Sequence, residues 1–142
     1  MVTPAARRNL EAHIRGESAR NLDALMTPLS DRPRYVIPGF VLEGRAAVQA
    51  MYQACLPMLT PELSDEFLRA LGDPAVTRWG ENHCVIEYSD AYPLHRGMVV
   101  VVHFDGDRVM SENTYFTSAS RFAAASFPAN AFAGIAGATP VD

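Results

Sequence analysis

The stretch MVVVVHFDGDRVMSENTYF, residues 98–116, contains two runs of β-branched and aromatic residues on either side of Asp105-Gly106. An Asp-Gly pair between two such runs is typical of a tight turn between antiparallel strands. The stretch therefore predicts a β-hairpin, with strands over Met98–Phe104 and Arg108–Phe116.

Further short apolar runs precede this hairpin and are separated by glycine- and proline-containing breaks such as Gly72-Asp73-Pro74. They predict strands over Arg34–Ile37, Phe67–Leu71, Ala75–Trp79 and Cys84–Ser89. Pro38-Gly39 is expected to end the first of these strands.

Helical signals lie mainly in the first half of the chain. Thr3-Pro4 predicts a helix that continues to about Arg20, and Asn21 can cap a second, short one. A third, amphipathic helix is predicted over Arg45–Leu59, with Pro61 just beyond its end. A short helix is also expected over Ser118–Ala125.

Helices followed by antiparallel strands are the α+β pattern, in which helices pack on one face of a curved sheet. We expect one domain over residues 1–126 and an Ala/Gly/Pro-rich tail over residues 127–142. A curved sheet folded over a helix layer can leave a cavity open at one end, and such a cavity is the default ligand site.

The 142 residues are 49% hydrophobic and 20% charged, a globular composition. Twelve basic and sixteen acidic residues give a net charge of −4, which argues against a general nucleic-acid binder. All the basic residues are arginine, so Schiff-base chemistry through a lysine is excluded. No run is long enough for a membrane span and no signal peptide is visible, so we expect a cytoplasmic protein.

Cys55 and Cys84 are too few for a disulfide framework. We expect two reduced, apolar side chains, with a single bridge or a reactive thiol as the alternatives.

Four segments, in this order, resemble the SnoaL-like branch of the nuclear transport factor 2-like superfamily: residues 13–26, 35–39, 42–52 and 103–116. The resemblance implies a cone-shaped α+β barrel with a central hydrophobic pocket, often in a dimer. Members include polyketide cyclases, steroid isomerases, epoxide hydrolases and dehydratases, so the fold alone does not give the reaction.

The resemblance also allows the known acid positions to be compared residue by residue. Where steroid isomerases carry a tyrosine acid and two aspartates, this chain has His13, Ile37 and Val100. Where epoxide hydrolases carry two aspartates, it has Val100 and Thr114, and Thr117 stands near the acid of the polyketide cyclases. The acids known from these relatives are thus replaced, although Ile37, Val100 and Thr114 remain expected pocket residues.

His13 is the first candidate for chemistry, because it lies next to the apolar stripe of the first predicted helix. An imidazole can transfer a proton near neutral pH, and Glu17, one turn later, could orient it. The structural alternative is a pair on the helix surface.

Glu112 is the second candidate, since strand alternation that follows the resemblance points Glu112, Thr114 and Phe116 inward. A carboxyl group in an apolar pocket can act as an acid or a base. If the register slips by one residue, Glu112 lies instead on the outer face of the sheet.

Tyr35 shares the facing of Ile37 and offers a phenol to a ligand, or packs in the core with its hydroxyl satisfied. Trp79 and Phe116 could form an aromatic wall, or serve as core. His83 lies at a strand start and His95 in a loop that could cover the pocket mouth, and both are interpreted as surface residues. His103 is expected to face outward.

No metal or cofactor is expected: the four histidines show no paired spacing, and GxGxxG, P-loop and GxSxG motifs are absent. The sequence hypothesis is a cofactor-independent enzyme that acts by proton transfer on a small hydrophobic molecule, as a cyclase, isomerase or dehydratase. His13 would be the base or acid, Glu17 its partner, Glu112 the opposing carboxyl group and Tyr35 a hydrogen-bond donor. The alternative is a non-catalytic binding or assembly module. A homodimer is expected through the outer face of the sheet, since Val99–Val102 offers apolar groups to both faces.

Overall fold

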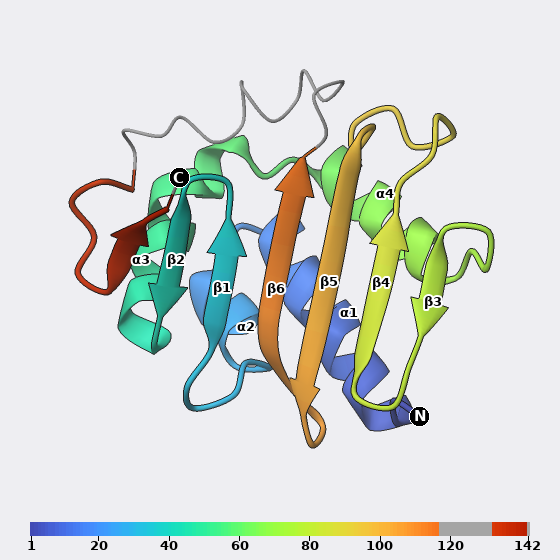
Figure 1. The fold of residues 1–142 in the computed structure, drawn as a ribbon, viewed down its shortest axis with the longest axis horizontal. Helices are drawn as coiled ribbons and strands as arrows, with labels where there is room; N and C mark the ends of the chain where they lie inside the picture. The colour runs from blue at the N-terminus through green and yellow to red at the C-terminus, as the bar shows by residue number, and fades with distance from the viewer. Residues whose placement is uncertain (117–131, 142) are drawn as a thin grey trace.

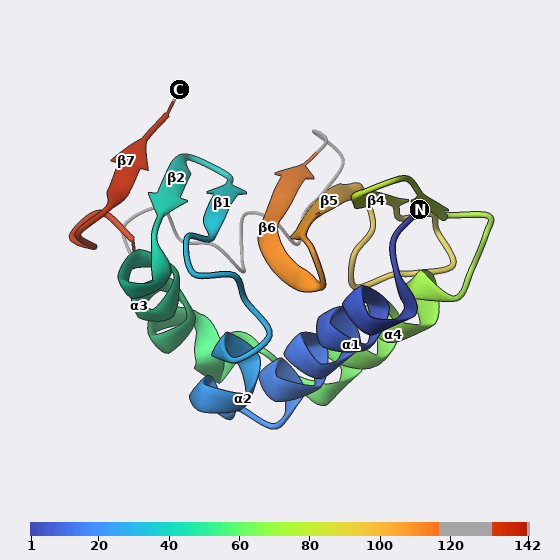
Figure 2. The same ribbon diagram turned by 90° about the horizontal axis from the view of Figure 1, so that it is seen from below.

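The computed structural model describes residues 1–116 and 132–141, with the helices on one side of the strands (Figures 1 and 2). The helices are α1 (Pro4–Ser18), α2 (Leu22–Met26), α3 (Arg45–Cys55) and α4 (Pro61–Leu71). The strands are β1 (Arg34–Ile37), β2 (Phe40–Glu43), β3 (Thr77–Trp79), β4 (His83–Glu87), β5 (Met98–Asp105), β6 (Arg108–Phe116) and β7 (Ala138–Pro140). The α+β prediction is confirmed.

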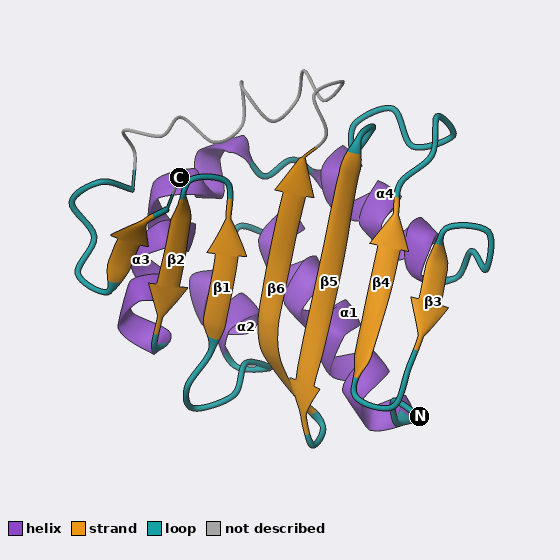
Figure 3. Cartoon of the chain, in the orientation of Figure 1, coloured by secondary structure: helices purple, strands orange, loops and turns teal. Residues whose placement is uncertain are grey.

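The strands form two antiparallel sheets, with the orders β3-β4-β5-β6 and β1-β2-β7. Strand β1 lies beside β6, which brings the two sheets edge to edge (Figure 3). The Asn113 side-chain oxygen accepts a hydrogen bond from the Val36 N–H at 2.9 Å across this junction.

The predicted hairpin is β5-β6, and its pairing shifts register between His103 and Phe104. Side chains alternate along β5: Val100 and Val102 are buried, whereas Val101 and His103 are half-buried on the other face. The alternation expected for a strand with one face against the core is therefore present.

The two N-terminal helices begin as their capping residues predict. The Thr3 hydroxyl accepts from the Ala6 N–H at 3.0 Å, and the Asn21 side chain accepts from the Ala24 N–H at 3.1 Å. The helices meet closely at Gly16, where an added Cβ would lie 2.5 Å from the backbone nitrogen of Leu25. Only glycine allows this approach without displacing backbone.

The strand predicted over Phe67–Leu71 is wrong, because these residues are the second half of α4. Thr60 caps this helix by accepting from the Leu63 N–H at 3.4 Å, and Pro61 occupies its first turn. Pro61 was interpreted as a stop, but Thr60-Pro61 repeats the start signal of Thr3-Pro4. Helix α3 also ends earlier than predicted, at Cys55, and a 3₁₀ turn over Leu56–Met58 follows it.

Two strands were not predicted. Strand β2 follows the turn at Pro38-Gly39, and β7 comes from the Ala/Gly/Pro-rich tail and pairs with β2. Phe132, also from the tail, is buried against Phe40. The helix expected over Ser118–Ala125 lies outside the described residues, and none of the described helices is long and apolar enough to cross a membrane.

Candidate functional site

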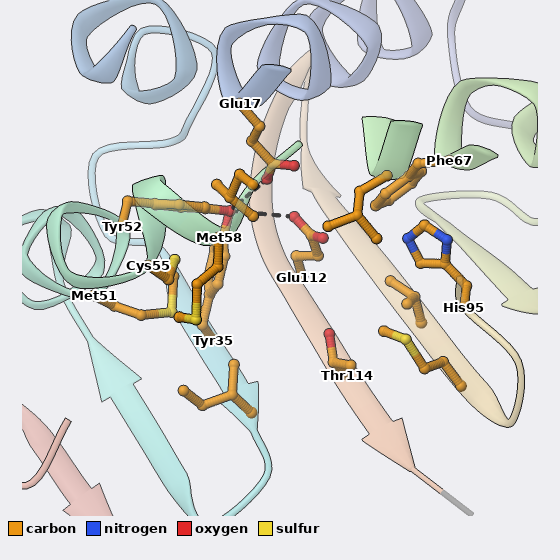
Figure 4. Close-up of a pocket in the computed structure, with 15 residues that line it drawn as sticks. Glu17, Tyr35, Met51, Tyr52, Cys55, Met58, Phe67, His95, Glu112 and Thr114 are labelled. Carbon is orange, nitrogen blue, oxygen red and sulfur yellow. Dashed lines mark hydrogen bonds between the residues drawn. The ribbon is translucent and has the colours of Figure 1, made fainter. Parts of the chain in front are cut away.

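A cavity of about 90 Å³ lies in the core, with residues from both sheets and from α1, α3 and α4 in its wall (Figure 4). Most of the wall is apolar: Ile37, Met51, Met58, Leu59, Leu63, Phe67, Met98 and Val100. The polar or titratable lining residues are Glu17, Tyr35, Tyr52, Cys55, His95, Glu112 and Thr114. The cavity thus has the apolar wall and the few polar groups that are usual for a small-molecule site.

Four of these polar residues meet at the Nε2 atom of His13, and we call His13, Glu17, Tyr35, Tyr52 and Glu112 the proton cluster. This nitrogen lies 2.9 Å from the Tyr52 hydroxyl and 3.2 Å from a carboxylate oxygen of each glutamate. The Tyr35 hydroxyl is 3.4 Å away. Helix α1 supplies the first two residues one turn apart, and β1, α3 and β6 supply the others.

The two ring nitrogens of His13 face different acceptors. Its Nδ1 lies 2.6 Å from the carbonyl oxygen of Leu25, which can only accept, so Nδ1 carries a hydrogen. The second proton, on Nε2, faces the two carboxylates. Leu25 therefore orients the ring as a backbone carbonyl does in many catalytic histidines.

The charges of the proton cluster favour a protonated His13. Burial alone lowers the pKa of His13, but hydrogen bonds to Glu112 and Glu17 and their negative charges outweigh it and raise the pKa to about 10. Burial, together with the charge of Glu112, also raises the pKa of Glu17 above its usual range. His13 and Glu17 are therefore more ready to hold a proton than isolated groups of their types.

The two tyrosines complete the cluster as hydrogen-bond donors. The Tyr52 hydroxyl lies 3.1 Å from Glu17, 3.3 Å from the Tyr35 hydroxyl and 3.4 Å from Glu112. Burial and the charge of Glu112 raise the pKa values of both tyrosines well above 10. Both hydroxyls thus stay protonated at neutral pH and can donate to an oxygen in the cavity.

The same groups offer ligand atoms for a metal. Among the described residues, His13, Glu17 and Glu112 each present one such atom within 4.8 Å of the others. A metal at Nε2 would have to displace the proton there, because a histidine nitrogen binds a metal only without its proton. The cluster therefore offers the same three ligand atoms to a proton or to a metal ion.

The structure brings most of the sequence candidates together. Glu17, Tyr35, Glu112, Ile37, Val100 and Thr114 all line the cavity. His13 is fully buried and is not itself in the wall, so it reaches the cavity only through its partners in the proton cluster. The structure therefore gives His13 no direct contact with the cavity.

Trp79 and Phe116 form no aromatic wall, since neither lines the cavity. The alternative of core packing is confirmed, because both pack against the hydrophobic core. Trp79 lies on β3, at the edge of its sheet remote from β6, and the Arg7 guanidinium lies 4.0 Å above its ring. Phe116 is half-buried at the end of β6, opposite Met98.

Sequence reasoning missed two functional candidates. In the amphipathic pattern of Arg45–Leu59, Tyr52 is only one of the apolar positions, and His95 is interpreted from the sequence as a surface residue. Both are in fact buried and line the cavity. The phase of Tyr52, on the same helix face as Val48 and Met51, was the available signal for its burial. Nothing local in the sequence marks His95, whose burial depends on α4.

No protein-family model matches the sequence, and neither does any curated protein. Solved structures do match. An NTF2-like protein of unknown function from Cytophaga hutchinsonii is similar with a TM-score of 0.55 over 82% of this chain and 92% of the other, at 12% identity. The chain has the NTF2-like fold.

Two further structures agree with the NTF2-like fold. A SnoaL-like protein of unknown function from Burkholderia thailandensis has a TM-score of 0.52 over 83% of this chain and 99% of the other, at 20% identity. A protein named as a candidate ketosteroid isomerase from Kribbella flavida has a TM-score of 0.53 over 84% and 82%, at 12% identity. At these identities the NTF2-like neighbours establish the fold, and the reaction must be argued from the site.

Proposed function

We propose that this protein is a cofactor-independent enzyme of the isomerase, cyclase or dehydratase type, which moves protons on a small hydrophobic molecule in a barrel pocket. The observation that carries the proposal is the proton cluster, whose carboxyl and phenol groups line a largely apolar cavity. Proton-transfer enzymes place titratable groups of perturbed pKa at such sites.

In this proposal Glu112 is the group that meets the substrate. Its carboxylate takes a proton from a carbon beside a substrate carbonyl, and the electron pair moves to the carbonyl oxygen. Tyr35 or Tyr52 donates a hydrogen bond to that oxygen, which stabilises the charge that develops there. The proton then returns to another carbon, so no oxidant or reductant is needed.

His13 is a positioning residue in this scheme. Its imidazolium lies 3.2 Å from both Glu112 and Glu17 and keeps the two carboxyl groups together in an apolar surrounding. Glu17, with its raised pKa, is suited to supply a proton rather than to take one. Two carboxyl groups can thus divide the basic and acidic roles.

The test is deuterium exchange on a panel of monocyclic ketones in D₂O, followed by NMR. The wild type should accelerate exchange beside the carbonyl of at least one ketone, and Glu112→Gln should lower this rate by roughly 10²–10⁴-fold. Glu87→Gln is the matched control, because Glu87 is an exposed strand glutamate on β4. The control should keep the wild-type rate.

Full exchange activity in Glu112→Gln would refute the mechanism. A wild type that exchanges no ketone, yet retains a small molecule in native mass spectrometry, would favour the alternative of a non-catalytic binding module.

A further inference from the structure

Thr114 places a hydroxyl group in the cavity wall, separate from the proton cluster. It lies on β6 opposite Val100 of β5, it is 7% exposed, and it lines the cavity. The next pair on the same face of these two strands, Met98 and Phe116, is apolar. Thr114 is therefore a polar position on an apolar stretch of the sheet.

The Thr114 hydroxyl makes no hydrogen bond within the part of the chain that the structure describes. Thr77, by contrast, is also buried, and its hydroxyl donates to the Ala70 carbonyl at 2.6 Å. Figure 4 shows the Thr114 oxygen on the side of the residue nearer to Glu112. Because a buried hydroxyl without a partner is costly, proteins pair such groups with protein, water or ligand atoms. Thr114 is thus placed to contact a molecule in the cavity.

The spacing along β6 relates Thr114 to Glu112, the group that meets the substrate in the proposed reaction. These two residues pair with Val102 and Val100, with regular register between them. Two residues of an antiparallel strand rise about 7 Å and point to the same face. This separation is comparable to the length of a six-membered ring that carries an oxygen atom at each end.

The size of the cavity limits the ligand. One water molecule needs roughly 10–15 Å³ of such space. A cavity of about 90 Å³ therefore accommodates a single ring with short substituents rather than a fused four-ring skeleton.

We propose that the substrate is a one-ring ketone with a second oxygen, a hydroxyl or a carbonyl, on the opposite side of the ring. The ketone oxygen accepts from the tyrosine hydroxyls of the proton cluster, and the second oxygen forms a hydrogen bond with the Thr114 hydroxyl. This inference rests on the proposed function for the ketone end of the site, and it adds the substrate class. Thr114 is then the residue that distinguishes an oxygenated ring from one with a hydrocarbon substituent.

The test compares two ketones of equal size, 4-methylcyclohexanone and 4-hydroxycyclohexanone, which differ by one methyl group replaced by a hydroxyl. NMR titration of the protein gives the dissociation constant of each. The wild type should bind the hydroxy ketone at least as tightly as the methyl ketone. Thr114→Val keeps the shape of the side chain but removes its hydroxyl, which leaves the ligand hydroxyl buried unpaired. Affinity for the hydroxy ketone should then fall about tenfold, while affinity for the methyl ketone stays within about twofold.

Two further variants make the comparison specific to the hydroxyl of this residue. Thr114→Ser retains a hydroxyl and should retain the wild-type preference between the two ketones. Thr139→Val, at an exposed position of β7 outside the cavity wall, is the matched control and should bind both ketones as the wild type does. Thermal unfolding of each variant checks that it is folded.

Equal losses for both ketones in Thr114→Val, an unchanged affinity of this variant for the hydroxy ketone, a wild type that prefers the methyl ketone tenfold, or a wild type that binds neither would each overturn the inference. Deuterium exchange on the same two ketones is measured separately, so the proposed reaction can fail independently. A protein that shows the expected binding pattern but exchanges neither ketone keeps the ligand class and loses the reaction.

Discussion

The Nε2 proton of His13 joins the acidic and phenolic groups of the candidate site. The Nε2 nitrogen lies among two carboxylates and two hydroxyls, each with an oxygen within 3.4 Å of it. Without this positive charge, two carboxylates would face each other in an apolar surrounding, which is costly. The geometry of the cluster therefore depends on a protonated imidazole.

NMR titration of the four histidines tests this dependence. We expect His13 to remain an imidazolium through pH 8, since its pKa is raised to about 10 by Glu112 and Glu17 against the effect of burial. His103 is the internal reference, because burial and the neighbouring His83 lower its pKa. Ring ¹⁵N shifts that report a neutral His13 at pH 7 would contradict the cluster as described.

At the residue scale, the sequence predicted those site residues that follow the regular period of a helix or a strand. His13 and Glu17 follow from a helical stripe, whereas Glu112 and Thr114 follow from strand alternation whose phase the resemblance to SnoaL-like proteins supplies. The roles of Tyr52 and His95 depend on contacts with residues 39 and 29 positions away, and no local pattern carries that information.

Among the elements, the contact between α1 and α2 positions the site most directly. Gly16 lets the backbone of Leu25 approach α1, and the Leu25 carbonyl orients the His13 ring one turn earlier. Arg45 of α3 ties the end of α2 by donating to the carbonyls of Met26 and Leu29. The short helix α2 is thus a fixed support for the imidazole.

Gly16→Ala should lower the free energy of unfolding by about 1–3 kcal/mol, because the added Cβ would overlap the backbone of Leu25. Urea unfolding measures this loss. In Gly72→Ala, the matched control, the nearest atom to the new Cβ is 3.7 Å away, and stability should change little. Equal stabilities for the two variants would show that α2 can move away at no cost.

The order of the elements also explains why a strand was wrongly predicted over Phe67–Leu71, within α4. An apolar run such as Phe67–Leu71 fits a strand or a buried helix equally well when it is considered alone. The capping residue Thr60 resolves the ambiguity, and it lies seven positions upstream of the run. Strands β2 and β7 are three or four residues long, too short for a periodic signal.

For the whole molecule, we propose that the outer face of the four-stranded sheet forms a homodimer. Val85 and Val101 are paired neighbours on this face and are half-buried, and Tyr115 is 47% exposed nearby on β6. Apolar side chains in a row on a sheet face are usual in protein interfaces.

Sedimentation velocity at micromolar concentration should therefore show a dimer, and Val101→Lys should shift it to monomer. Asp65→Lys, at an exposed position of α4 away from this face, is the control and should leave the dimer intact. A wild type that sediments only as a monomer would exclude this interface.

His13 and Glu112 are 99 positions apart in the chain, so the surroundings that hold the Nε2 proton exist only after α1 and β6 have met. In the unfolded chain His13 titrates near 6.5, and in the native state near 10. Between these values the native state binds more protons, so stability is fully present below pH 6.5 and declines as the pH rises toward 10. Folding near pH 8 is then a proton-consuming reaction, and the buffer supplies the proton. The calorimetric enthalpy of unfolding should accordingly differ between Tris and phosphate, in proportion to their ionisation enthalpies.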